Sequence, residues 1–283
     1  MQIFESVPNI SEGRDKQKIK TLLDALRPIE NLKILDYSSD ADHNRSVFTY
    51  IGTYEAVLRA GAALVQKAAE ILDLREHAGV HPRLGVVDVL PIIPVYQTEM
   101  DDAVRLAREL GAEIEKIGIP AVYYEYAAQD PGERNLADIR RKRYNNTHPK
   151  AGLVCIGARN YLVAYNINLE TADVEIAKTI AKQIREHGGG LRGVKALGLY
   201  LKSRNCAQVS MNLVAPEITG PQEVFAKVKS LAEGVGVQVK ERELIGVLPN
   251  FVAREAQKLS EDIERKIALL KNMSEKAKEK KLQ

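Results

Sequence analysis

The chain has 283 residues, of which 45% are hydrophobic and 28% are charged, and its formal net charge is +3. This length suffices for one large domain or for two domains of about 140 residues. The mild charge argues against nucleic acid as the main partner, and the lack of a long apolar run argues against a membrane span. The N-terminus lacks the pattern of a secretory signal, and the cysteines, Cys155 and Cys206, lack metal-type spacing. A cytoplasmic protein with reduced thiols is therefore expected.

The first ninety-odd residues predict the element order βαββαβ. β-Branched and aromatic residues indicate the strands, and apolar residues at spacings of three and four indicate the helices. Ser11 and Asp15 are candidate caps of the first helix. The last strand, Val86–Pro94, is almost continuously apolar, as expected of a strand buried on both faces. The other strands are Phe4–Ile10, Lys33–Ser38 and Ser46–Gly52, and the helices are Lys16–Leu26 and Tyr54–Leu74.

The same order returns in the second half of the chain. Three glycines end the first helix of this copy, and Pro221 begins the second helix. Residues 250–283 then show the apolar spacing of a terminal helix. The strands are Leu162–Asn168, Ala196–Leu201, Ala207–Leu213 and Val237–Leu244, the helices are Ala172–His187 and Pro221–Gly234, and the terminal helix has apolar positions at Ala256, Leu259, Ile263, Ile267 and Leu270.

A βαββαβ unit is the ferredoxin-like arrangement, an antiparallel sheet with two helices on one face. Two copies predict an α/β (α+β) fold of two similar subdomains, residues 1–160 and 161–283, with a ligand cleft between them. A single mixed sheet with more helices is the alternative.

An insert separates the two copies. It is expected to hold the helix Asp101–Ile117, the short strand Ala121–Tyr126 and a basic helix or loop at Glu133–Tyr144. Its basic cluster, Arg140–Arg143, is interpreted as a solvated face. Binding of an acidic ligand tail by this cluster is the alternative.

The most informative motif is the segment EHAGVHPRLG, residues 76–85, between a predicted helix and a predicted strand. Histidine is the side chain whose unperturbed pKa allows proton transfer near neutral pH. Here His81 stands before Pro82, which keeps it out of helical geometry, and two residues before Arg83. This pattern predicts a general acid/base beside an anion-binding group. Structural hydrogen bonding by two loop histidines is the alternative.

Two further loops are rich in polar residues. In the turn VPNISEG, Asn9, Ser11 and Glu12 are candidates for ligand contact, and helix capping with a tight turn is the structural alternative. The segment Asp40–Arg45 is dense in ionisable groups, but no further group stands at ligand spacing, so no metal is expected. A hydrogen-bonded hairpin turn is expected there instead of a metal site. The planar fork of Arg45 suits a carboxylate.

The segment Cys155–Asn168 is expected to open the second copy. Gly157 permits close backbone approach. Asn166 and Asn168 share one side of a strand, where their amides suit the donor and acceptor edge of a heterocycle. A solvated edge strand is the alternative.

Five of these segments, in this order, resemble the glutamate formiminotransferase family. The resemblance runs from residue 5 to about residue 255. In animals this domain is fused to a cyclodeaminase, which the resemblance does not include. The segments are Val7–Gly13, Asn44–Gly52, His81–Pro94, Gly157–Leu169 and Gln208–Leu213.

The resemblance implies transfer of a formimino group from N-formimino-L-glutamate to N5 of tetrahydrofolate, a co-substrate, with no metal. It implies a homodimer with small-molecule substrates. The composition already indicates a cytoplasmic protein with neither nucleic acid nor membrane as a partner. His81 matches the catalytic histidine. Ser38 stands where some relatives have an acid, and Asp40 and Asp42 are candidates to replace it. The expected folate and substrate contacts are Gly157, Ala158, Arg159, Asn160, Tyr165, Asn166, Asn9, Glu12, Arg45 and Asp40.

Other functions remain open. A related folate enzyme would use formiminoglycine or 5-formyltetrahydrofolate, and the sequence does not separate these substrates. A non-catalytic folate-binding protein is a further alternative, because ferredoxin-like folds have many functions. The cluster Arg140–Arg143 is the only support for nucleic-acid binding.

Overall fold

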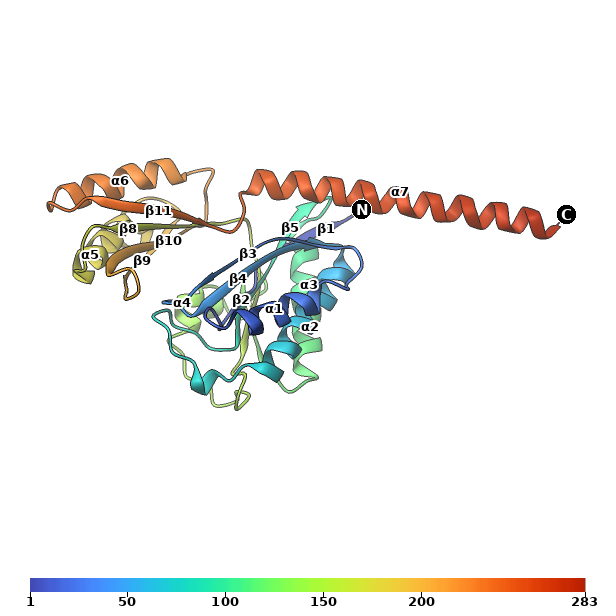
Figure 1. Ribbon diagram of the computed structural model, residues 1–283, viewed down its shortest axis with the longest axis horizontal. Coiled ribbons are helices and arrows are strands. Elements are labelled where there is room, and N and C mark those ends of the chain that lie inside the picture. Colours follow the sequence, from blue (N-terminus) through green and yellow to red (C-terminus); the bar gives the residue numbers. More distant parts are fainter. Residues whose placement is uncertain (283) are drawn as a thin grey trace.

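Two β-sheets form the framework of the molecule, one in each half of the chain (Figure 1). The structure is a computed structural model that describes the backbone of residues 1–282 and the side chains of residues 1–269 and 271. The first sheet has seven strands and the second has four. The predicted α/β (α+β) fold with two similar subdomains is confirmed, and the single mixed sheet is wrong.

The first sheet contains the predicted antiparallel unit, with the order β3-β4-β1/β2-β5. Its first strand was expected to be continuous, but it is interrupted around Pro8, which has no N–H to donate to the ladder. Asp15 caps α1 as predicted, whereas Ser11 does not. The strands are β1 (Ile3–Ser6), β2 (Asn9–Ile10), β3 (Leu32–Asp40), β4 (Arg45–Gly52) and β5 (Val87–Tyr96), and the helices are α1 (Lys16–Leu26) and α2 (Tyr54–Ile71).

The insert extends this first sheet. After α3 (Met100–Glu115), β6 (Ala121–Glu125) and β7 (Val154–Ala158) join the edge of β5 as parallel strands. The prediction that Cys155 opens the second copy is therefore wrong, because β7 lies between β5 and β6 in the first sheet. β7 is buried along its whole length, as is usual for a parallel strand. The remaining short elements here are η1 (Leu74–Glu76), η2 (Pro131–Glu133) and α4 (Leu136–Ile139).

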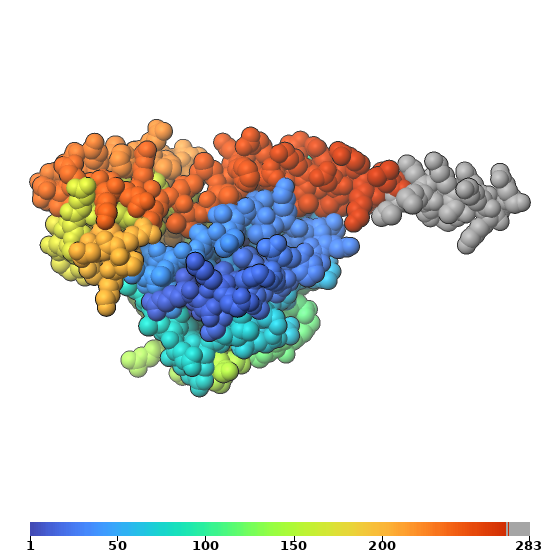
Figure 2. Space-filling model, viewed as in Figure 1, coloured from blue at the N-terminus to red at the C-terminus, as the bar shows by residue number. Residues whose placement is uncertain are grey.

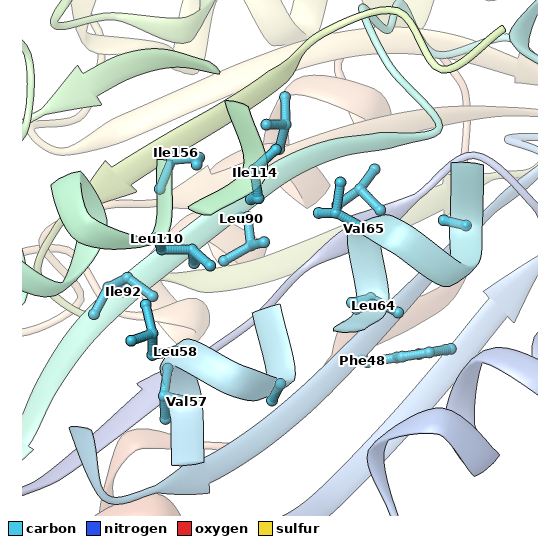
Figure 3. Close-up of a cluster of buried hydrophobic side chains, with 14 of the residues drawn as sticks. Phe48, Val57, Leu58, Leu64, Val65, Leu90, Ile92, Leu110, Ile114 and Ile156 are labelled. Carbon is cyan, nitrogen blue, oxygen red and sulfur yellow. The ribbon is translucent and has the colours of Figure 1, made fainter. Parts of the chain in front are cut away.

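A hydrophobic core fills the space between the first sheet and α1, α2 and α3 (Figure 3). Burying each large aliphatic side chain contributes about 1.5–3 kcal/mol. The end of α2 and the start of β5 are both anchored in this core, so they fix the ends of the loop that carries His81. The labelled members are Phe48, Val57, Leu58, Leu64, Val65, Leu90, Ile92, Leu110, Ile114 and Ile156.

The second sheet is fully antiparallel, with the ferredoxin-like order β11-β8-β10-β9. Tyr165 and Ile167 pack into the core beneath the helices, and Asn166 and Asn168 alternate with them along β8. The elements are β8 (Val163–Leu169), α5 (Val174–Ile184), η3 (Glu186–Gly188), β9 (Val194–Leu201), β10 (Cys206–Leu213), α6 (Pro221–Glu233) and β11 (Val239–Ile245).

The last helix, α7 (Pro249–Leu282), returns to the first sheet. Its residues Val252, Ala256 and Ile263 pack against Ile3 and Ile51 on the face opposite α2. Ile267 is 37% exposed, and the side chain of Leu270 lies outside the described residues.

In the space-filling view the second subdomain lies against the first (Figure 2). The division at residue 160 stays a prediction, with β7 ending at Ala158 and β8 beginning at Val163. Within the described part of the chain, no helix is long and apolar enough to span a bilayer.

Candidate active site

The histidine motif lines a surface pocket of about 370 Å³. Arg83 holds the motif against the turn between β3 and β4, because its guanidinium donates to the carbonyl oxygens of His43 and Asn44 at 2.6 and 3.0 Å. A Cβ atom at Gly79 would lie 2.2 Å from the His43 carbonyl oxygen, so only glycine fits there. The lining residues are Leu74, His77, Ala78, Gly79, His81 and Arg83.

His81 is held in one neutral form. Its Nδ1 lies 2.8 Å from the carbonyl oxygen of Pro82. A carbonyl only accepts, so this hydrogen bond assigns the proton to Nδ1 and leaves the lone pair on Nε2. Burial, together with the charges of Arg45 and Arg140, lowers the pKa of His81 to about 2. The imidazole is therefore neutral at neutral pH, with Nε2 unprotonated.

Arg140 is close enough to His81 for its charge to lower the pKa of the imidazole. The prediction of a solvated face at Arg140–Arg143 is therefore wrong for Arg140, whereas residues 141–143 are exposed. The Nη2 of Arg140 lies 2.5 Å from Asp88, and its side chain is only 17% exposed. Arg141, by contrast, is 78% exposed and pairs with Asp138, three residues earlier in the chain. The buried side chain of Ile139 anchors the short helix α4 against the sheet and brings Arg140 inward.

Arg45 is the second cation whose charge lowers the pKa of His81. Burial lowers its pKa to about 10, and Arg140 and Arg83 add to this while Asp88 opposes it. Its Nε is buried without a hydrogen-bond partner in the described part of the chain. A planar guanidinium with free donors is suited to bidentate binding of a carboxylate through two parallel hydrogen bonds.

Asp40 belongs to a hydrogen-bonded turn. Its Oδ1 accepts from the backbone N–H and the Nδ1 of His43, both at 2.8 Å. Burial raises the pKa of Asp40, but the hydrogen bonds from His43 and the charge of Arg204 outweigh burial and lower it to about 2. Arg204 and Ser203, which contacts Asp42, come from the turn between β9 and β10. The side-chain contacts between this β9–β10 turn and the β3–β4 turn therefore link the two subdomains.

The segment VPNISEG forms hydrogen bonds with the loop that carries the histidines. Ser11 was a candidate helix cap, but its hydroxyl donates to the carbonyl oxygen of Gly85 at 2.6 Å. The carbonyl oxygen of Ser11 lies 3.0 Å from the Nδ1 of His77. Glu12 accepts from two backbone N–H groups of the following turn, and Asn9 donates to the carbonyl oxygen of Val7.

Family models match both halves of the chain. The N-terminal subdomain of the formiminotransferase domain matches residues 3–154, and the formiminotransferase domain matches residues 164–276. The chain belongs to the formiminotransferase family. It is 40% identical to a glutamate formimidoyltransferase of Thermoplasma acidophilum, over 88% of this chain and 89% of that protein. It is 38% identical to a glutamate formimidoyltransferase of Streptococcus pyogenes serotype M1, with the same coverage.

The chain is also 35% identical to the formimidoyltransferase-cyclodeaminase of Gallus gallus. That match covers 88% of this chain and 50% of the relative, so the chain spans about half the length of that bifunctional protein.

In this formiminotransferase, the expected folate segment begins between the two matched ranges, and its contacts stay predictions. Gly157 makes room for Tyr124, whose ring would lie 2.4 Å from a Cβ atom. Ala158 and Tyr165 lie in the cores of the first and second subdomains. Arg159 donates to the carbonyl oxygen of Asn160 at 2.8 Å. Asn166 is buried on β8.

Two charged residues, Asp88 and Glu5, were not identified from the sequence, and Arg140 was expected on a solvated face. Glu5 is only 4% exposed, and burial raises its pKa to about 7, although Arg159 lowers it. Asp88 and Glu5 each interrupt an apolar strand with a carboxylate, and this signal is visible in the sequence. Among the described residues, no group of three or more His, Cys, Asp or Glu is placed to hold a metal ion.

Proposed function

We propose that this protein transfers the formimino group of N-formimino-L-glutamate to N5 of tetrahydrofolate and releases glutamate. The observation that carries the proposal is the neutral His81, with Nε2 open, in a chain 40% identical to a glutamate formimidoyltransferase. General acid/base catalysis of this reaction needs one group that first accepts and then returns a proton.

In this reaction, N5 attacks the amidine carbon of the donor and forms a new C–N bond. Nε2 of His81 takes the proton that N5 loses. The tetrahedral carbon then breaks its bond to the glutamate nitrogen, which receives the proton back from Nε2. No electron transfer is involved, and neighbouring polar groups stabilise the charged intermediate.

The proposal also covers the co-substrate, the oligomeric state, the location and the binding residues of the protein. Tetrahydrofolate is the co-substrate, it binds in a cleft between the subdomains, and the reaction needs no metal. The protein acts as a cytoplasmic homodimer, without nucleic acid or membrane as a partner. The folate and substrate contacts are Gly157, Ala158, Arg159, Asn160, Tyr165, Asn166, Asn9, Glu12, Arg45 and Asp40.

The test is incubation of the purified protein with tetrahydrofolate and N-formimino-L-glutamate, with the absorbance of 5-formiminotetrahydrofolate as the readout. We expect His81→Ala to retain folate binding and to lose turnover by about 10²-fold or more. Near-normal turnover of this variant would remove His81 from the mechanism.

The same assay separates the alternatives. Turnover with formiminoglycine or with 5-formyltetrahydrofolate, and none with N-formimino-L-glutamate, would identify a related folate enzyme with a different substrate. Folate binding without turnover of any donor would make the protein a non-catalytic folate binder.

A further inference from the structure

Arg45 is a half-buried cation at the start of β4, and its Nε is fully buried. Within the described residues it forms no ion pair, and its Nε has no hydrogen-bond partner. A buried charge is costly unless it is paired. A bound anion at this guanidinium would therefore supply the negative charge and the hydrogen-bond acceptors that the described residues do not provide.

The charge of Asp88 opposes the lowering of the Arg45 pKa, but both oxygens of Asp88 are hydrogen-bonded to other groups. Asp88 accepts from the Nη2 of Arg140 at 2.5 Å through one oxygen and from the backbone N–H of Leu84 at 2.6 Å through the other. The Nε of Arg140 is itself buried without a partner in the described part of the chain. Two guanidinium groups beside His81 thus have donors to spare.

Arg83 has a different role. Its Nε and both terminal nitrogens donate to the backbone carbonyls of His43, Asn44 and His81. Its charge adds to the positive potential, but its donors are used within the protein. Three guanidinium groups and one carboxylate therefore surround the site, which leaves an excess of positive charge.

We propose that Arg45 and Arg140 form a subsite for a carboxylate of the amino-acid donor, next to His81. The assignment to the donor rests on the proposed function. The carboxylates of folate lie beyond its p-aminobenzoyl group, far from N5, whereas the α-carboxylate of formiminoglutamate lies two bonds from the nitrogen that departs. A guanidinium pair near the catalytic imidazole therefore fits the donor rather than the folate tail.

The first test is binding of L-glutamate, the released product, to the full chain without folate, measured by calorimetry and by thermal shift. We expect glutamate to bind wild type and to raise its Tm, and we expect Arg45→Gln to lose this binding by roughly 10- to 100-fold. Arg141→Gln is the matched control, because its side chain is exposed, and it should retain binding within about twofold. Absence of glutamate binding to wild type, or equal loss in the control, overturns the subsite.

The second test is kinetic. We expect Arg45→Gln and Arg140→Lys to raise KM for formiminoglutamate by roughly 10- to 100-fold and KM for tetrahydrofolate by less than about threefold. The effect should persist when tetrahydropteroate, which lacks the glutamate tail, replaces tetrahydrofolate. Loss of the effect with tetrahydropteroate assigns the anion to the folate tail and overturns the proposal.

These measurements separate the subsite from the proposed function. Glutamate binding that depends on Arg45, in a protein without transferase activity, supports the subsite and rejects the reaction. Arg45→Lys retains the charge, so partial recovery of glutamate binding in this variant is expected. Circular dichroism of each variant identifies any that fails to fold.

Discussion

The Nη2 of Arg140 lies 2.5 Å from the Oδ2 of Asp88, across a sequence separation of 52 residues. This pair ties the short helix α4 to the start of β5, and it puts a cation beside His81. Because Asp88 is buried and Arg140 is only 17% exposed, the pair stabilises the site only while both partners are present.

We expect Asp88→Asn to lower the free energy of unfolding by about 3–5 kcal/mol, since it leaves the Arg140 guanidinium buried without its carboxylate. Urea denaturation measures this loss. Asp138→Asn is the matched control, because it breaks the exposed pair with Arg141, and it should cost less than about 1 kcal/mol. Equal losses in the two variants would show that burial does not set the strength of the Asp88 pair.

Both βαββαβ units could be read from the sequence, because apolar periodicity and turn residues agree along each of them. The position of β7 could not, since VCIGA is a short apolar run whose partner strands depend on long-range pairing. The burial of Arg140 depends on the packing of Ile139. It could not be predicted, because a cluster of four basic residues indicates an exposed surface. His81 and Arg45 were identified from residue type and motif, but their proximity required the fold.

The pH profile of kcat/KM is expected to have no acidic limb near pH 6.5 from His81. Burial and the charges of Arg45, Arg140 and His43 lower the pKa of this imidazole to about 2, although its hydrogen bond to Pro82 opposes the shift. kcat/KM reports ionisation of the free enzyme, so the base form persists through the assay range.

Arg45→Gln removes one of these cations, so the pKa of His81 should rise in this variant, while burial, the larger cause, still holds it below 6.5. Profiles from about pH 5 to 9 for wild type and the variant make the comparison. A wild-type limb near pH 6.5 that disappears in a His81 variant would contradict the expected environment of the imidazole.

The stability of wild type relative to Glu5→Gln is expected to fall as pH rises. Burial raises the pKa of Glu5 in the folded protein to about 7 from 4.5, so the folded state binds more protons than the unfolded chain in this interval. The contribution is full below about pH 4.5 and is lost through pH 7, and it amounts to about 3 kcal/mol.

Urea denaturation of both proteins at about pH 5 and pH 8 tests the sign. A difference between wild type and Glu5→Gln that is independent of pH would mean that Glu5 is ionised in the folded protein throughout.

Gly79→Ala is expected to lower turnover because it displaces the loop that carries His81. The new Cβ atom would lie 2.2 Å from the backbone carbonyl oxygen of His43, and a backbone atom cannot move away as a flexible side chain does. The same carbonyl accepts from Arg83 at 2.6 Å, so relief of the clash shifts that anchor too. A displacement of about 1 Å at a catalytic group costs roughly 10²-fold in rate, and kcat at saturating substrates measures it. Gly132→Ala is the control, because its Cβ atom would meet only the side chain of Asp130 at 3.3 Å, and it should leave kcat unchanged. Wild-type kcat in Gly79→Ala would mean that the position of His81 tolerates movement of this loop. It would also contradict the role of Arg83 as an anchor of the loop.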